Sequence, residues 1–374
     1  MSNLGIGVIG CGNISAAYMR LAPLFKGIEM RACADMNMEA ATARAEEFGL
    51  RAETVEGLLA ADDVDIIVNL TVPNAHFEVS KAILEAGKHS YSEKPFVLTL
   101  GEGEALRALA AEKGLRVGSA PDTFMGGAHQ LARAVLDEGQ AGTILSGTCH
   151  VLSRGMEMWH PNPDFFFQPG GGPVLDLGPY YITNLVQLLG PVKSVAAMTG
   201  QGFETRTIGS GARTGETVPV GTPTSIHALL EFANGAQITM GSSWDVAAHR
   251  HKNMELYGSD ASLYVPDPNF FGGDVILAGT EGETIVSDRD HPFGKPNDDH
   301  EPPQANYRCA GLADMAVAIA EGRPHRCSLE LATHVVEVMT GILKAGEERR
   351  WVDMTTTCER PEALSPEAAA ALLA

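Results

Sequence analysis

A glycine-rich segment near the start of the chain has the pattern of a phosphate-binding turn. Gly10-Cys11-Gly12-Asn13-Ile14-Ser15 lies between an apolar stretch that predicts a strand and a pattern that predicts a helix. Glycine at the first position permits a tight turn, and glycine at the second lets backbone N–H groups approach a pyrophosphate at the helix N-terminus. Ser15 replaces the usual Gly or Ala but is still small. The segment predicts a dinucleotide site; a plain strand–turn–helix is the alternative.

An acidic residue ends the next predicted strand. Asp35 follows Gly12 by 23 residues, near the ~20 expected of a carboxylate that binds the adenosine ribose. Its charge would repel a 2′-phosphate, and the neighbouring Met36 and Asn37 supply no arginine. NAD is therefore the predicted cofactor, with NADP less favoured; the alternative is a surface aspartate.

Two more segments follow predicted strands at the same edge of the sheet, where cofactors bind. In the first, Thr71–His76, Pro73 holds the turn and Asn74 can cap the next helix; a capped loop without a ligand is the alternative. The second is Glu93-Lys94-Pro95. The residues expected to contact the cofactor are Gly10, Gly12, Asn13, Ile14, Asp35, Thr71, Pro73, Asn74, His76, Glu93 and Lys94.

A glycine run later in the chain completes a family pattern. It reads Gly170-Gly171-Gly172-Pro173-Val174-Leu175-Asp176-Leu177-Gly178-Pro179-Tyr180-Tyr181. With the glycine-rich turn and Glu93-Lys94-Pro95, it makes the chain resemble the glucose–fructose oxidoreductase/inositol dehydrogenase (Gfo/Idh/MocA) family over roughly residues 4–350. The resemblance implies an active-site lysine at Lys94 near the nicotinamide, a cis Lys94–Pro95 bond, and catalytic roles for Asp176 and Tyr180. Many members have His in place of Tyr180, whereas the glucose–fructose oxidoreductase and dihydrodiol dehydrogenase branches have Tyr.

The spacing of the two catalytic candidates constrains the local structure. Asp176 and Tyr180 are four residues apart, so they share one face of a helix if that helix is continuous. Pro179 is tolerated in the first turn of a helix but kinks its interior. The helix is therefore expected to begin close to Asp176.

Hydride transfer at a CH–OH carbon needs a group that moves the hydroxyl proton. A tyrosine, with an ordinary pKa of about 10, is a weak base alone. An ammonium such as that of Lys94 beside Tyr180 would stabilise tyrosinate and lower that pKa. Asp176 would then orient Lys94 or bind a substrate hydroxyl. The reverse assignment, in which Lys94 transfers the proton, stays open.

An aromatic segment precedes the glycine run. Trp159 and His160, followed by Phe165–Phe167, could stack on and hydrogen-bond a sugar ring; equally, they could only anchor the loop to the core. Arg154 leaves the same two alternatives open. His249 and His251 have no clustered third ligand nearby in the sequence, so no metal site is expected.

The order of elements predicts two architectures. Strands and helices alternate through residues 1–121, which predicts an α/β Rossmann domain with a doubly wound parallel sheet. Residues 122–350 carry strands with hairpin signals such as Asn234-Gly235, which predicts an α+β domain with a large, mostly antiparallel open sheet. Within it, residues 201–223, rich in Gly and Thr, are expected to form a long loop. The packing of the tail, residues 351–374, is left open.

Composition excludes several classes of partner. Among 374 residues, 47 acids against 27 bases give a net charge of −20, which repels nucleic acid and anionic membranes. No apolar run approaches the ~18 residues of a membrane span. Six scattered cysteines without a C-x-x-C pair, and no visible secretory signal, favour reduced thiols in the cytoplasm.

The predicted function is an NAD(P)-dependent dehydrogenase or reductase acting on a sugar, polyol or related cyclic alcohol. Two alternatives are an NAD-using glycoside hydrolase and a non-enzymatic NAD-binding regulator of the same fold. A homo-oligomer, dimer or tetramer, is expected through the exposed face of the antiparallel sheet, as the resemblance also implies.

Overall fold

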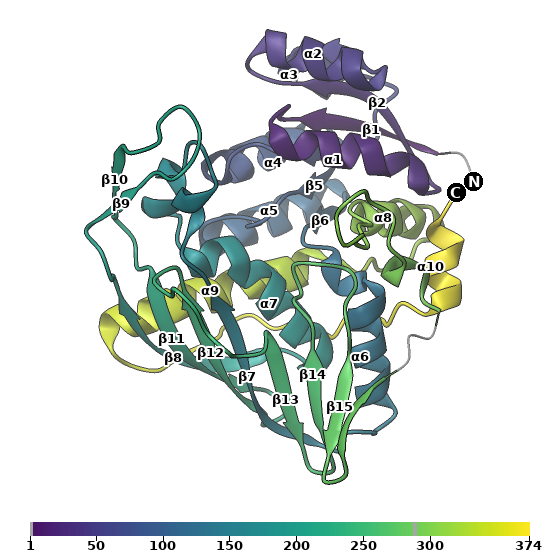
Figure 1. Cartoon of the computed structure of the whole chain (residues 1–374). Coiled ribbons are helices and arrows are strands. Elements are labelled where there is room, and N and C mark those ends of the chain that lie inside the picture. The colour runs from purple at the N-terminus through teal and green to yellow at the C-terminus, as the bar shows by residue number, and fades with distance from the viewer. Residues whose placement is uncertain (1–2, 287–289) are drawn as a thin grey trace. The chain divides into compact units, whose positions relative to one another are not determined.

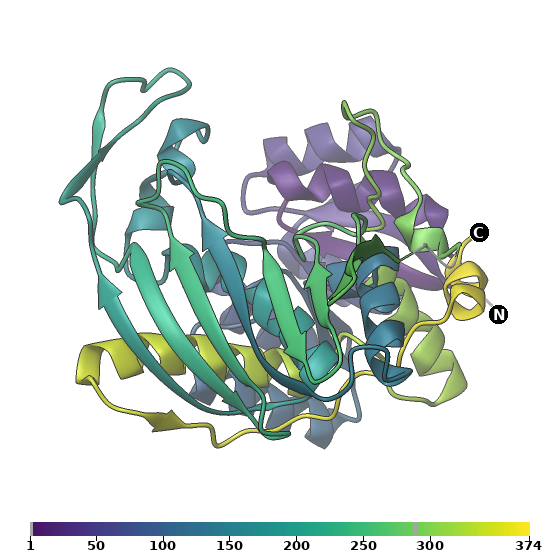
Figure 2. The ribbon, with the colours of Figure 1, turned by 60° about the horizontal axis from the view of Figure 1, so that its bottom comes forward.

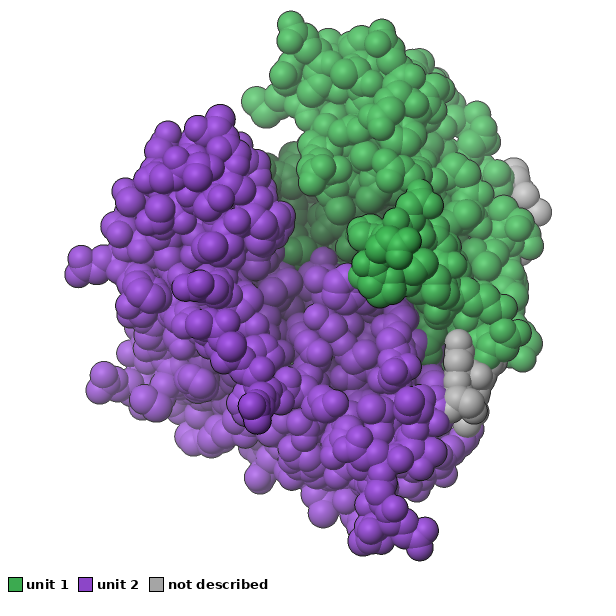
Figure 3. Space-filling model, in the orientation of Figure 1, with its two compact units in different colours: residues 1–127, 290–336, 361–374 green, residues 128–289, 337–360 purple. Residues whose placement is uncertain are grey.

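The computed structural model describes residues 3–286 and 290–374. The chain forms two compact units, coloured separately in Figure 3. Unit 1 comprises residues 1–127, 290–336 and 361–374, and unit 2 comprises residues 128–289 and 337–360. Unit 1 thus includes two segments from the C-terminal part of the chain. The division into functional domains at residues 1–121, 122–350 and 351–374 stays a prediction.

Six parallel strands form the sheet of unit 1, in the order β3-β2-β1-β4-β5-β6 (Figure 1). Their bounds are β1 Leu4–Ile9, β2 Ile28–Ala34, β3 Arg51–Glu53, β4 Ile66–Asn69, β5 His89–Ser92 and β6 Val117–Ser119. The order reverses between β1 and β4, and ligands of doubly wound sheets bind at such a switch point, beyond the carboxyl ends of the strands. The predicted parallel sheet is confirmed.

The helices of unit 1 follow local signals for the most part. They are α1 Asn13–Leu21, α2 Met38–Phe48, α3 Val55–Ala60, α4 His76–Glu85, α5 Leu100–Lys113, α8 Ala310–Glu321 and α10 Pro366–Leu372. Helix α2 ends at Gly49 in the left-handed conformation (φ 67°), as glycine permits. A capping box of Thr99 and Glu102 starts α5. Side chains of α3, β1, β2 and β4, such as Leu58 and Ile67, are fully buried in one apolar core.

A nine-stranded sheet dominates unit 2, in the order β16-β15-β14-β13-β7-β12-β11-β8-β17. Its strands are β7 Ile144–Leu152, β8 Val192–Gly200, β11 Ser225–Phe232, β12 Gln237–Ser243, β13 Met254–Gly258, β14 Ser262–Val265, β15 Ile276–Gly279, β16 Gly282–Ile285 and β17 Val352–Asp353. All neighbours pair antiparallel except β7 and β12, which are parallel. The predicted, mostly antiparallel sheet is confirmed.

Helices cover one face of this sheet. The unit also contains α6 Gly127–Asp137, which begins at the boundary, α7 Pro173–Leu189, and the second half of α9 Leu329–Glu348. Helix α7 packs against β7, β11 and β12. Helix α9 lies against β8 (Figure 2), where a Cβ on Gly346 would come within 2.3 Å of the Thr199 side chain. Glycine therefore allows the close approach of this helix to the strand.

Residues 201–223 are not the long loop expected from their glycine and threonine content. They contain β9 Thr205–Thr207 and β10 Thr217–Pro219, which pair antiparallel. Ile208 and Val218 are buried in a core that also contains Phe167 and Trp244. The strands were missed because each is three residues long, too short for a period-2 pattern to be recognised.

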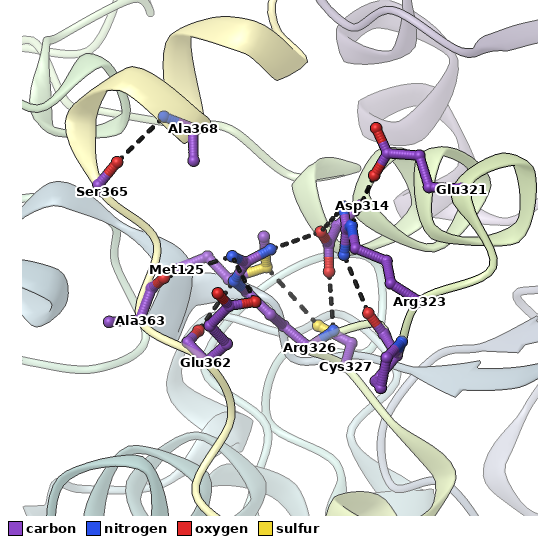
Figure 4. Close-up of polar contacts among 11 residues, drawn as sticks. Met125, Asp314, Glu321, Arg323, Arg326, Cys327, Glu362, Ala363, Ser365 and Ala368 are labelled. Carbon is purple, nitrogen blue, oxygen red and sulfur yellow. Dashed lines mark hydrogen bonds and ion pairs between the residues drawn. The ribbon is translucent and has the colours of Figure 1, made fainter.

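A buried ion-pair cluster anchors the last segment of the chain to unit 1 (Figure 4). Asp314 of α8, which has no exposed surface, accepts from the backbone N–H and the guanidinium of Arg326 at 2.7 and 2.6 Å. Arg323 donates to the same carboxylate at 3.0 Å. Arg326 also donates to the Glu362 carbonyl at 2.9 Å and to the Ala363 carbonyl at 3.3 Å. Residues 361–374 thus pack on unit 1, which answers what the sequence left open for that part of the tail.

Replacing Asp314 with alanine is expected to lower the free energy of unfolding by roughly 3–5 kcal/mol, because the Arg326 cation would be left buried without its carboxylate. Urea unfolding of the variant measures this. Glu104→Ala is the matched control, since its partner Arg107 is exposed and such a pair contributes about 1 kcal/mol or less. Equal losses in the two variants would contradict the role assigned to Asp314.

Among the residues that the structure describes, no helix combines the length and apolar character needed to cross a membrane. All six cysteines are buried, and none forms a disulfide bond.

Candidate active site

The glycine-rich turn connects β1 to α1 at the switch point of the unit 1 sheet. Gly10 has φ 104°, and a Cβ there would come within 2.6 Å of the Leu70 carbonyl oxygen. A Cβ on Gly12 would meet no atom within 4 Å, so this glycine leaves open space in front of the helix. Gly12 is the N-cap of α1 without a side-chain cap. The free N–H groups of the first turn and the open cradle fit the pyrophosphate of a dinucleotide.

Ser15 fits the position that usually holds Gly or Ala. Its side chain is fully buried, and its hydroxyl donates to the Gly12 carbonyl at 2.6 Å. Serine is therefore accommodated at this position, because its hydroxyl is satisfied by a hydrogen bond within the turn.

Asp35 stands at the carboxyl end of β2 beside the glycine-rich turn. One carboxylate oxygen accepts from the Cys11 N–H at 2.8 Å, and the other accepts from the Asn37 N–H at 2.8 Å. Arg44 of α2 donates to the Gly12 carbonyl at 3.2 Å and pairs with Glu47. The sequence interpretation found no arginine next to Asp35 in the chain, but the fold brings Arg44 to the same turn.

Replacing Asp35 with asparagine keeps an acceptor oxygen and removes the charge. We expect the affinity for NAD to fall roughly tenfold or more and the preference over NADP to shrink, because the predicted charged hydrogen bond to the ribose would be lost and a 2′-phosphate would no longer meet a like charge. Fluorescence titration with both cofactors measures this, with the exposed Asp62→Asn as control. An unchanged ratio of the two affinities would contradict a ribose-binding role.

The loop after β4 is shaped by a buried asparagine that the sequence interpretation missed. The Asn69 amide donates to the His76 carbonyl and to the Ser80 hydroxyl, both at 3.0 Å. Its oxygen accepts from the N–H and the hydroxyl of Thr71 at 3.2 and 2.7 Å. The signal was present, because Asn69 is the polar end of an otherwise apolar strand. The expectation that Asn74 caps the helix is wrong: α4 follows a 3₁₀ turn over Pro73–Ala75 and has no side-chain cap.

His76 ties this loop to the segment after β5. Its ring is 1% exposed, with Nδ1 2.7 Å from the Pro95 carbonyl oxygen and Nε2 3.0 Å from the Thr71 carbonyl oxygen. Burial lowers the pKa of His76, against the opposing effect of the two carbonyl groups. Both ring nitrogens face backbone carbonyl oxygens, and the neutral ring can donate to one of them. His76 therefore lies between Thr71 and Pro95, and we no longer expect its ring to touch the cofactor.

Glu93 supports the backbone of the lysine that follows it. Its carboxylate, in a residue that is 8% exposed, accepts from the Tyr18 hydroxyl at 2.9 Å and from the Lys94 backbone N–H at 3.0 Å. Burial, and then the charge of Glu93, raise the pKa of Tyr18 well above its usual value. Lys94 itself is half-buried, and the Lys94–Pro95 bond is cis, as the resemblance implies. Glu93 therefore holds the backbone of Lys94 in place.

A second buried carboxylate, also missed from the sequence, follows β6. Asp122 is 1% exposed and accepts from the backbone N–H groups of Cys309 and Gly311, at 3.0 and 3.1 Å. Cys309, at φ 88°, precedes α8, which begins at Ala310. Burial raises the pKa of Asp122 to about 6, although the nearby Arg308 lowers it.

This pKa predicts a pH-dependent contribution to stability. The folded state holds a proton on Asp122 up to about pH 6, whereas an unfolded aspartate loses it near pH 4. The free energy of unfolding should therefore fall by roughly 3 kcal/mol as the pH rises from about 4 to 6. Urea titrations across that range should show a shallower fall in Asp122→Asn than in the wild type. Parallel curves would show that Asp122 does not titrate there.

The glycine run of unit 2 leads into α7. A Cβ on Gly171 would come within 2.4 Å of the Phe166 carbonyl oxygen, and Gly172, the N-cap, has φ 95°. The helix begins at Pro173 and continues through Pro179, which cannot donate to the Leu175 carbonyl. The first residue of α7 thus lies three residues before Asp176. Because α7 is continuous, the half-buried Asp176 and the 7% exposed Tyr180 lie one turn apart on the same face.

The aromatic segment before the glycine run contains both buried side chains, which anchor it, and exposed ones. Phe167 is fully buried and packs edge-on against Trp244, with ring centroids 5.5 Å apart. Trp159 is 62% exposed, and the half-buried His160 ring lies edge-on to it at 5.5 Å. Arg154 is exposed. Phe167 is thus an anchor, whereas Trp159, His160 and Arg154 remain available to a ligand.

Arg206 of β9 holds this segment in place. The guanidinium is buried and pairs with Glu157 at 3.1 Å and with Asp245. It also donates to the carbonyls of Arg154 and Trp244, at 3.4 and 3.2 Å. The sequence gives no signal for this role, because the Gly- and Thr-rich residues 201–223 predict a loop. Within the described residues, no group of three or more His, Cys, Asp or Glu side chains is placed to hold a metal ion.

Within unit 1, the structure brings together the glycine-rich turn, Asp35, the Thr71–His76 loop and Lys94 at the carboxyl edge of one sheet. Within unit 2, it brings Asp176 and Tyr180 onto one helix face. The aromatic segment is joined to the start of that helix, since Leu177 packs in the core that contains Phe167.

Comparison with known proteins places both parts of the chain. Residues 4–120 match the oxidoreductase family with an NAD-binding Rossmann fold, and residues 129–264 match the GFO/IDH/MocA C-terminal domain. The chain belongs to the GFO/IDH/MocA family of oxidoreductases. The family resemblance inferred from the sequence, the enzyme class and the NAD-binding domain are thereby confirmed.

Relatives within the GFO/IDH/MocA family act on sugars, by their names. Levoglucosan dehydrogenase of Pseudarthrobacter phenanthrenivorans is 26% identical over 95% of this chain and 99% of its own length. A dTDP-3,4-didehydro-2,6-dideoxy-alpha-D-glucose 3-reductase of Actinomadura kijaniata is 35% identical over 50% of this chain and 56% of its own. The structure of levoglucosan dehydrogenase with NADH shares the fold, with a TM-score of 0.79 and 23% identity over 95% of this chain and all of its own.

Proposed function

We propose that this chain is an NAD-dependent dehydrogenase or reductase that acts on a CH–OH group of a sugar, polyol or related cyclic alcohol. The observation that carries the proposal is Lys94, held through its backbone by Glu93 at the same sheet edge as the open glycine cradle. The names of the relatives, a levoglucosan dehydrogenase and a deoxysugar reductase, support a carbohydrate substrate.

The residues of unit 1 would hold the cofactor by complementary chemistry. The first-turn N–H groups of α1 at Asn13 and Ile14 would bind the pyrophosphate, and Asp35 would bind the adenosine ribose. Thr71, Pro73 and Asn74 would line the same edge. NAD supplies the nicotinamide carbon that accepts or returns a hydride when it is bound.

The proton chemistry is assigned to three side chains. Tyr180 Oη takes the proton of the substrate hydroxyl during oxidation and returns it during reduction. Lys94 would supply the positive charge that stabilises the tyrosinate. Asp176, one turn from Tyr180, binds a second substrate hydroxyl or orients the ammonium. In the reverse assignment, Lys94 Nζ moves the proton and Tyr180 binds the hydroxyl.

Recognition of the sugar is assigned to the exposed part of the aromatic segment. The face of Trp159 can stack on the C–H face of a sugar ring, and His160 and Arg154 can hydrogen-bond its hydroxyls. Arg206 holds the backbone of this segment and supports these contacts indirectly.

The test is NADH formation at 340 nm against aldoses, inositols, anhydro-sugars and sugar acids, with NAD and NADP run in parallel. We expect turnover with NAD on at least one carbohydrate. Release of an aglycone from a glycoside without net NADH would instead identify a hydrolase. Binding of NAD by calorimetry without turnover of any substrate would favour a non-enzymatic regulator.

The expected homo-oligomer stays a prediction. One face of the nine-stranded sheet carries exposed apolar side chains, among them Met198 at 77% and Leu229 at 50% exposed. A second copy of the chain could cover this face, and light scattering on Met198→Glu beside the wild type tests that arrangement.

A further inference from the structure

A cavity of about 550 Å³ opens on unit 1 away from the cofactor edge. Its wall is formed by the end of α5, the start of β6, the end of α8 and the start of α9. Val117, the first residue of β6, lines it, whereas the glycine-rich turn follows the last residue of β1. Because the strands are parallel, the cavity lies at the opposite edge of the sheet. Its volume is within the range of 300–1,000 Å³ typical of small-molecule sites.

Three arginines line this cavity, and they differ in their partners. Arg107 pairs with Glu104, and Arg323 pairs with Glu321 and Asp314. The guanidinium of Arg116 has no such carboxylate among the residues that the structure describes; its backbone N–H donates to His89 Nδ1. Although the chain has 47 acidic residues, none of those that the structure describes forms an ion pair with this half-buried cation.

A buried histidine, His325, also lines this cavity. His325 is 8% exposed, and its Nε2 lies 3.1 Å from the Val117 carbonyl oxygen, to which it donates. Nδ1 is then an acceptor, and it is buried without a hydrogen-bond partner in the described part of the chain. A buried polar atom left unpaired destabilises the folded state. Burial lowers the pKa of His325, which keeps the ring neutral and Nδ1 an acceptor.

The start of α9 adds a third element. Ser328 and the first residues of this 20-residue helix line the cavity, and the Ser328 hydroxyl accepts from the Leu331 N–H at 3.2 Å. The first N–H groups of a helix have no intrahelical partner and favour a nearby anion. The exposed Glu330 carboxylate also lines this wall, and its charge raises the pKa of Arg107 and opposes the lowering of the His325 pKa by burial.

We propose that this cavity is a second ligand site, which binds a small hydroxylated anion. Arg116 and the start of α9 would hold the anionic group, and a hydroxyl of the ligand would donate to His325 Nδ1. A phosphorylated sugar and a sugar acid share this chemistry. The cavity is larger than a bare oxyanion requires, so the ligand carries more than its charged group.

The test is calorimetric titration of the NAD-saturated protein, so that the glycine-rich turn is already occupied. Inorganic phosphate, glucose 6-phosphate and gluconate are the probes, and the last two distinguish a phosphoryl from a carboxylate ligand. We expect saturable binding of glucose 6-phosphate or gluconate, with phosphate alone weaker. Arg116→Gln should weaken that binding roughly tenfold or more, the loss expected for a charged hydrogen bond.

Two controls make the result specific to this cavity. Arg20→Gln removes the same charge from an exposed position of unit 1 and should bind as the wild type does. Hexanoate has a carboxylate but no hydroxyl, and should bind more weakly than gluconate. Absence of saturable binding, or equal affinity in Arg116→Gln and the wild type, would overturn the proposal. Equal binding of hexanoate and gluconate would overturn the role of His325.

Discussion

Replacing Lys94 with alanine is expected to abolish measurable turnover, a loss of roughly 10³-fold or more, while NAD still binds. In the proposed mechanism, the variant would remove the charge that stabilises the deprotonated tyrosine, or the proton carrier itself in the reverse assignment, and either loss would fall on the chemical step. The contact to Glu93 is made by the Lys94 backbone N–H, so it persists in the variant. Loss of activity can therefore be assigned to the side chain and not to collapse of the loop.

The measurement is kcat and KM on the best substrate, together with the affinity for NAD by fluorescence titration. Lys113→Ala is the matched control, because Lys113 is an exposed residue of unit 1 at the end of α5. A kcat close to that of the wild type in Lys94→Ala would remove Lys94 from the mechanism. Equal loss of NAD affinity and turnover would assign the lysine to cofactor binding alone.

Replacing Tyr180 with phenylalanine is expected to lower kcat by roughly 10²- to 10⁴-fold, the range for loss of a positioned acid or base. The ring is kept, so the packing of α7 is preserved and KM should change less than kcat. If Lys94 instead carries the proton, the loss should fall mainly on KM, because Tyr180 would then only bind the hydroxyl.

The adjacent tyrosine provides the control for this experiment. Tyr181 is 2% exposed, and its hydroxyl accepts from the Asn253 side chain at 2.8 Å. Burial and the neighbouring Asp267 raise the pKa of Tyr181 well above its usual value, so it is not a base. Tyr181→Phe should lose about 1 kcal/mol of stability and keep its turnover. Equal effects of the two substitutions on kcat would show that Tyr180 has only a structural role.

Local patterns in the sequence determined the architecture of both units and the type of cofactor. The parallel sheet follows from apolar strands that alternate with helices, and the antiparallel sheet from strands joined by hairpin signals. The turn at Gly10 and Gly12 needs conformations and open space that only glycine provides, and Asp35 is placed by the end of its strand. These features are readable because each depends on residues that are close together in the chain.

Only the tertiary structure decided how the candidate residues are supported. Asp122 accepts from an N–H group 187 residues away, and Arg206 reaches Glu157 across 49 residues. Residues 290–336 and 361–374 likewise pack in unit 1, far in the sequence from residues 1–127. Such contacts produce no periodic pattern in the sequence. A buried polar group needs one hydrogen-bond partner, and any distant segment can supply it. The sequence therefore predicts the candidate residues of the site, and the tertiary structure shows which distant side chains contact and support them.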